Sequence, residues 1–143
     1  MYEDILVATD GGERMTDAIE RTIEFAEGRK ATVHAVSVID EGTFLTLDDE
    51  LKGEVAAELE TTASEAVQQV AEAVEAAGLN SIAEVRRGQP DEEIVAYATQ
   101  QDIDLIVIGT RGSESYEKQM LGSVSKAVVS NANCPVLTVP LDS

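Results

Sequence analysis

Short, nearly continuous apolar runs alternate along this chain with longer segments of helical periodicity, and this alternation limits the fold more than any other feature. Residues 4–9 (DILVAT) and 104–109 (DLIVIG) are two such runs, each ended by turn-forming residues. Runs of this kind fit strands that are covered on both faces, as in parallel sheets. Residues 31–38 and 134–140 are similar, and residues 81–88 form a weaker fifth run. We therefore expect five strands.

Apolar residues at helical spacing occupy the segments between these runs. Residues 15–26 and 51–77 carry long stripes of this kind. Residues 89–93 (QPDEE) place proline and acids in a first helical turn, where both are favoured. A shorter helix is expected after Gly122. The order β-α-β-α-β-α-β-α-β predicts a single α/β domain over residues 1–143, with an open parallel sheet between two layers of helices.

The net charge of −18 excludes some functions and bears on the habitat. Disorder is excluded because 43% of the residues are hydrophobic and strictly patterned. Nucleic-acid binding is disfavoured because it depends on Lys and Arg to neutralise phosphates, and this chain has 10 such residues against 28 acids. At about 1 M salt the Debye length is only about 3 Å, so an acidic surface would repel itself little. We therefore expect a salt-loving source organism.

The location of the protein follows from what its sequence does not carry. No run approaches the roughly 18 apolar residues of a membrane span. The first residues, MYEDILVATD, have acids where a signal peptide needs a basic flank. Cys134 is the single cysteine and cannot form an internal disulfide, which fits a reducing compartment. We expect a cytoplasmic protein without a membrane partner.

In doubly wound sheets, ligands bind beyond the carboxyl ends of the strands, where the strand order reverses. The residues that follow the expected strands are therefore the candidates for a site: residues 9–12, 38–42, 86–88 and 109–112. Asp10 is the acid among them that ends the first strand. It could bind a ribose hydroxyl or a metal ion, or it could be an ordinary turn aspartate before two glycines.

Residues 109–126 (GTRGSESYEKQMLGSVSK) carry the pattern of an anion cradle. Gly109 and Gly112 can adopt positive φ and allow a ligand close to the backbone. Gly122 and Ser123 open a helix, whose free N–H groups and positive dipole favour phosphate. The lysine of the familiar phosphate loop is absent. The alternative is that the glycines form a tight strand exit and that Ser123 only caps a helix.

Several sharper motifs are not matched. The dinucleotide-binding fingerprint needs a third glycine at another spacing. The Ser-x-x-Lys at Ser123 lacks its companion motifs. A receiver domain would need an acidic pair after the first strand. His34 lies within a strand and Cys134 begins one, so we expect both to be packing residues rather than metal or catalytic groups.

Taken together, Gly109-x2-Gly112-x9-Gly122-Ser123 resembles the G-x2-G-x9-G-[S/T] motif of ATP-binding universal stress proteins. The resemblance runs nearly end to end, through ILVATDGGE, VIGTRG, LGSVSKAVV and CPVLTV. It implies a five-stranded sheet in the order 3-2-1-4-5, the three-layer sandwich of adenine nucleotide alpha hydrolase-like proteins. It also implies ATP or another adenine nucleotide as ligand, with Mg or Mn, for which Asp10 is a candidate protein ligand. The residues implied for the base and ribose are Ala8, Thr9, Asp10 and Val38, and those implied for the phosphates are Gly109, Arg111, Gly112, Gly122, Ser123, Val124 and Ser125.

The same resemblance implies a homodimer through the last strand (Val136, Leu137, Thr138 and Val139), which would otherwise be an exposed edge. Two positions depart from the family pattern. Gly12 stands where serine is frequent, and the loop between the glycines carries Glu114 and Glu117. We expect these two acids to point to solvent.

Three functions follow from these features. The first is a nucleotide-binding stress or signalling module with little or no hydrolysis, because no dedicated catalytic base is evident. The second is a dimeric interaction protein of the same family that has lost nucleotide binding. The third is an ATP-using enzyme of the related superfamily, which would need a Ser-Gly-Gly-x-Asp-Ser motif in place of ATDGGE.

Overall fold

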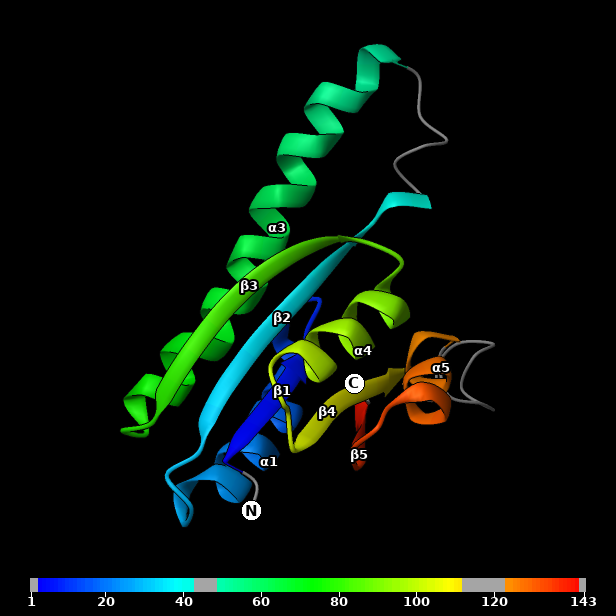
Figure 1. The fold of residues 1–143 in the computed structure, drawn as a ribbon. Coiled ribbons are helices and arrows are strands. Elements are labelled where there is room, and N and C mark those ends of the chain that lie inside the picture. Colours follow the sequence, from blue (N-terminus) through cyan, green and yellow to red (C-terminus); the bar gives the residue numbers. More distant parts are fainter. Residues whose placement is uncertain (1–2, 43–48, 112–122, 142–143) are drawn as a thin grey trace.

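The molecule is built on a five-stranded parallel sheet with helices on both faces (Figure 1). A computed structural model describes residues 3–42, 49–111 and 123–141, without the side chains of residues 49, 50 and 111. The strands are β1 (Asp4–Ala8), β2 (Thr32–Asp40), β3 (Asn80–Gly88), β4 (Leu105–Arg111) and β5 (Val136–Leu141). The helices are η1 (Glu13–Met15), α1 (Thr16–Glu27), α3 (Asp49–Ala76), α4 (Pro90–Gln100) and α5 (Ser123–Asn131).

The strand order is β3-β2-β1-β4-β5, and every pairing is parallel, which confirms the predicted topology. The chain moves outward from β1 to β3 and then returns to the other side of β1 with β4. The order therefore reverses between β1 and β4, where Val7 pairs with Val107 and Ala8 with Ile108. The carboxyl ends of these two strands form the switch point of the fold.

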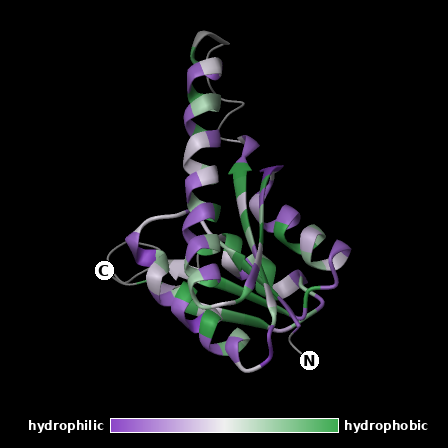
Figure 2. Ribbon diagram, turned by 90° about the vertical axis from the view of Figure 1, so that its left-hand side faces the viewer, coloured by the Kyte–Doolittle hydropathy of each residue, from purple (hydrophilic) through white to green (hydrophobic). Residues whose placement is uncertain are grey.

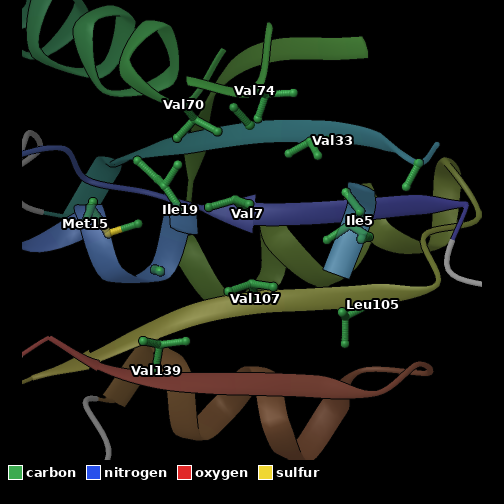
Figure 3. Packing of buried hydrophobic residues seen from close by; sticks show 14 of the residues in the cluster. Ile5, Val7, Met15, Ile19, Val33, Val70, Val74, Leu105, Val107 and Val139 are labelled. Atoms are coloured by element: carbon green, nitrogen blue, oxygen red, sulfur yellow. The ribbon is translucent and has the colours of Figure 1, made fainter. Parts of the chain in front are cut away.

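Alternate residues of the strands enter two separate hydrophobic layers, as the pleat requires. On one face, Ile5 and Val7 pack with α1 and α3, and Ile19 and Val70 are among their partners (Figure 3). On the other face, Leu6 packs against α4 and α5. Because both faces are covered there, β1, β2 and β4 are apolar along most of their length (Figure 2), whereas the edge strand β3 has no buried residue.

The strands differ from the predicted runs mainly at their ends. β2 and β4 continue two residues past the runs that end at 38 and 109, and β5 begins two residues after the run that starts at 134. Asp40 still pairs with Gly88, and Arg111 with Leu141, so polar residues extend the ladder beyond the apolar pattern. An apolar run ends where side chains are no longer buried, whereas a strand ends where backbone pairing stops, so the two boundaries fall at different residues.

Helix α3 is longer than the sheet that it covers. Its N-terminal part extends past the strand ends in both views (Figures 1 and 2). From Leu51 onward, the first buried side chain is Ala63, and burial then recurs through Ala66, Val67 and Val70. Helix α3 therefore has a packed C-terminal part and a protruding N-terminal part.

No helix in the described parts of the chain is both long and apolar enough to cross a membrane.

Candidate functional site

A cavity of about 620 Å³ lies beyond the carboxyl ends of β1, β2 and β4, at the switch point of the sheet. Its size is within the roughly 300–1,000 Å³ of typical small-molecule sites. Its lining combines strand ends with the starts of η1, α4 and α5. The lining residues are Ala8, Thr9, Asp10, Gly11, Arg14, Met15, Val36, Val38, Asp40, Pro90, Ile94, Ile108, Gly109, Thr110, Ser123, Val124, Ser125 and Leu141.

The turn after β1 is held by its own hydrogen bonds. Gly11 N–H donates to the Thr9 hydroxyl at 3.0 Å, and Thr9 N–H donates to the Val36 carbonyl at 3.0 Å. Gly11 and Gly12 have φ angles of +87° and +94°, a conformation that strongly favours glycine. This backbone accounts for Gly12 at a position where the resembled family often has serine. The turn leaves the Asp10 carboxylate exposed at the cavity.

Gly109 lies in the cavity wall for a reason other than the predicted one. It is an ordinary β4 residue paired with Val139, and it is not among the positive-φ glycines, so the expectation of a left-handed conformation was wrong. A Cβ at this position would overlap the Leu141 side chain of β5. Gly109 is therefore required by the close approach of a neighbouring side chain. That side chain also lines the cavity.

The start of α5 faces the same cavity. Ser123 is its first residue and is exposed, whereas Ser125 is buried. Val128 of the same helix is fully buried against the α4 face of the sheet. The first turn of α5 thus lies next to the carboxyl ends of β1 and β4.

The structure brings together most of the predicted site residues. Those that line the cavity are Ala8, Thr9, Asp10, Val38, Gly109, Ser123, Val124 and Ser125. Gly112, Gly122, Glu114 and Glu117 lie outside the described residues, as does the side chain of Arg111.

Two lining residues that bear on chemistry or shape were not predicted from the sequence: Arg14 and Ile94. Asp40 lies within the predicted candidate range 38–42 and lines the cavity, on the same face of β2 as Val36 and Val38. Ile94 belongs to the predicted apolar stripe of α4. Arg14 had no pattern to mark it, because η1 is a single turn of 3-10 helix.

His34 is a structural residue on the α4 face, two positions before the cavity residue Val36. Its Nε2 lies 2.9 Å from Asp4 Oδ1, and its Nδ1 lies 2.6 Å from the Tyr97 hydroxyl. A carboxylate only accepts, so Nε2 carries the proton and Tyr97 donates to Nδ1. Burial raises the pKa of Tyr97, so the hydroxyl keeps its proton. The expectation that His34 is a packing residue is consistent with this network, which joins β1, β2 and α4.

The donors at the cavity fit a metal ion carried by a nucleotide better than a site made by protein alone. Among the described residues, no group of three or more His, Cys, Asp or Glu side chains could hold a metal. Mg²⁺ is commonly bound by one or two carboxylates together with substrate phosphates. The exposed carboxylate of Asp10 suits that arrangement.

A parallel sheet of order 3-2-1-4-5 with helices on both faces and a cavity at its switch point defines a doubly wound α/β protein. Residues 1–140 match the model of the universal stress protein family, and the chain belongs to that family.

Known proteins support this assignment over nearly the whole chain. The universal stress protein MJ0531 of Methanocaldococcus jannaschii is 36% identical over 140 residues, which are 97% of this chain and 82% of that protein. The solved structure of MJ0577, from the same organism, superposes with a TM-score of 0.87 at 29% identity, covering 98% of this chain and 96% of that one. The fold is also shared with a universal stress protein from Archaeoglobus fulgidus, solved in complex with dAMP, which has a TM-score of 0.72 at 24% identity over 96% of this chain and 98% of that one.

Proposed function

We propose that this protein binds ATP or another adenine nucleotide at the switch-point cavity and acts as a stress-response module with little or no hydrolysis. The observation that carries the proposal is the cavity itself, in which the start of α5 and the Asp10 carboxylate meet beyond β1 and β4. An N-terminal helix turn favours phosphate, and an exposed carboxylate can bind a ribose or a phosphate-bound metal. The dAMP complex of the Archaeoglobus relative supports the choice of an adenine nucleotide.

The proposed roles are those that the resemblance to the family implies for each residue. The base and ribose are assigned to Ala8, Thr9, Asp10 and Val38, and the phosphates to Gly109, Arg111, Gly112, Gly122, Ser123, Val124 and Ser125. Mg or Mn would be held by Asp10 together with the phosphates. The described carboxylates of the lining are Asp10 and Asp40, and its described residues include no histidine. Hydrolysis needs a positioned water and stabilised charge, so we assign the site to binding.

The test uses Ser123, where a negative charge can be added without harming the helix. An acid in the first turn of α5 stabilises the helix dipole but repels phosphate. In Ser123→Asp, we expect the affinity for ATP, measured by calorimetry, to fall about tenfold or more at 0.1 M salt and by less at 1 M, because the added charge repels phosphate at a few ångströms and salt screens it. Ser123→Asn is the control, because it has the same size without the charge and should bind nearly as wild type. Equal ATP affinity in both variants would contradict the assignment.

We also propose that two copies associate through β5, in a cytoplasmic homodimer. β5 is an edge strand that pairs with β4 on one side, and edges of this kind tend to be covered or protected. The exposed Pro140 near its end limits the ladder that a partner strand could form. Light scattering on a sizing column should give twice the chain mass of 15.2 kDa. A mass of one chain at micromolar concentration would exclude the dimer.

A further inference from the structure

Arg14 differs from the other arginines whose side chains the structure describes. Side chains of five arginines are described, and four have partners: Arg21 pairs with Glu24, Arg29 donates to the Phe25 carbonyl, Arg86 pairs with Glu84 and Glu93, and Arg87 pairs with Glu60. Within the described residues, Arg14 has no hydrogen-bond or ion-pair partner. It lines the switch-point cavity.

The charges around Arg14 make its lack of a partner informative. The chain has 28 acids against 10 basic residues, and both Asp10 and Asp40 line the same cavity. Neither forms an ion pair with Arg14 in the described structure. Arg14 is exposed at this cavity and has no carboxylate partner there. A cation held in a cavity without one remains available to an anionic ligand.

The backbone of Arg14 is fixed although its side chain has no partner. Met15, the next residue, is buried in the core below α1 (Figure 3), and its N–H donates to the Gly12 carbonyl at 3.2 Å. The same carbonyl accepts a hydrogen bond from Gln69 Nε2 of α3 at 2.9 Å. The turn that carries Arg14 is thus anchored to two helices. A ligand contact would need to order only the side chain, which lowers its entropic cost.

We propose that Arg14 binds the polyphosphate of the ligand and makes the cavity select nucleotides by their number of phosphates. This inference rests on the proposed nucleotide binding. The start of α5 suits one phosphate group, and the Arg14 guanidinium on the β1 side of the cavity adds a bidentate donor for a further one. Nucleoside di- and triphosphates gain this contact. A nucleoside without phosphate does not.

The experiment compares adenosine, AMP, ADP and ATP in calorimetric titrations of wild type and Arg14→Gln. A charge-assisted hydrogen bond of this kind corresponds to about a tenfold or larger change in affinity. We expect Arg14→Gln to weaken ATP and ADP binding about tenfold and to leave adenosine unchanged. The matched control is Arg21→Gln, which removes an exposed arginine of α1 that pairs with Glu24. The loss should be larger at 0.1 M salt than at 1 M, because salt screens exposed charges.

The outcomes separate this inference from the proposed function. If wild type binds ATP and Arg14→Gln binds it equally well, Arg14 has no role in recognition and the inference is overturned. Equal weakening of adenosine and ATP would also overturn it, since that pattern indicates a damaged turn. If wild type binds no nucleotide, the proposed function fails. In that case, wild type and Arg14→Gln are titrated with inorganic triphosphate. Equal affinity of the two proteins for triphosphate would overturn the inference.

Discussion

At the scale of single residues, Gly109 and the pair of Tyr97 and His34 show that residue type follows from packing against other elements. Gly109 is set against Leu141 of the neighbouring strand, and no Cβ fits between them. Tyr97 and His34 satisfy each other's polar atoms inside an otherwise apolar layer. Neither requirement could be read from the chain near the residue itself, because the partner comes from another strand or helix.

Replacement of Gly109 should therefore be costly. In Gly109→Ala, the new methyl group displaces Leu141, and overpacking of this kind costs about 1–3 kcal/mol. Urea denaturation should show this loss in the free energy of unfolding. Gly28→Ala is the matched control, since Gly28 has a φ of −72° and open space around it. Equal stability of the two variants would show that Leu141 moves aside without cost.

Loss of the Tyr97 hydroxyl should destabilise the α4 face. Tyr97→Phe leaves the buried Nδ1 of His34 without a donor, which costs about 1–3 kcal/mol. Denaturant titration measures the change. Thr61→Ala is a suitable comparison, because it removes an exposed hydroxyl bond to the Ala57 carbonyl on α3 and should have little effect. A neutral Tyr97→Phe would mean that the hydrogen bond to His34 contributes nothing.

The same hydroxyl should make stability sensitive to alkaline pH. Burial raises the pKa of Tyr97 above its usual 10.0 and that of the Cys134 thiol above its usual 9.0. The folded protein therefore binds these protons more tightly than the unfolded chain does. The free energy of unfolding is unaffected by these groups below about pH 9 and falls as pH rises through their folded pKa values.

Thermal unfolding between pH 8 and 11 tests this expectation. The alkaline loss should be smaller in Cys134→Ala than in wild type, after allowance for the variant's stability at pH 8. The same loss in both proteins would assign the alkaline sensitivity to other groups.

At the scale of elements, the sequence predicted where strands and helices lie better than where they end. The apolar runs marked β1, β2, β4 and β5 because their side chains enter the two hydrophobic layers, whereas the run at β3 was weaker because none of its residues is buried. Proline and acids marked the start of α4 at Pro90. The ends of β2 and β4 were not predicted, because Asp40 and Arg111 are polar and join the sheet only through backbone pairing. The parts of the cavity formed by the strand ends and by the start of α5 were predicted from the sequence. Arg14 was not, because a single 3-10 turn has no periodicity.

Helix α3 should show two levels of sensitivity to substitution. Leu51 is 47% exposed on the protruding part, whereas Val70 is fully buried against the sheet. We expect Val70→Ala to lower the free energy of unfolding by about 1–3 kcal/mol and Leu51→Ala by less than about 0.5 kcal/mol. Chemical denaturation measures both. A larger loss for Leu51→Ala would indicate that the protruding part is packed in solution.

At the scale of the whole molecule, net charge is the dominant property. A charge of −18 on 143 residues destabilises the compact state through self-repulsion, and salt screens that repulsion. We expect the thermal unfolding midpoint to rise steeply between 0.1 and about 2 M NaCl, because salt screens the repulsion among many acidic side chains at once. Sucrose at equal osmolality serves as the uncharged control. An equal rise in sucrose would attribute the effect to solvent exclusion instead of charge.

The protruding part of α3 also determines how the molecule moves as a whole. At about 1.5 Å per residue, the 28 residues of the whole helix α3 form a rod of about 42 Å. A nine-residue strand such as β2 spans only about 30 Å. In a single chain, we therefore expect amide bonds along the axis of α3 to relax differently from those of helices that cross it. The nuclear spin relaxation rate of each backbone amide should then depend on the angle between its bond and the axis of α3.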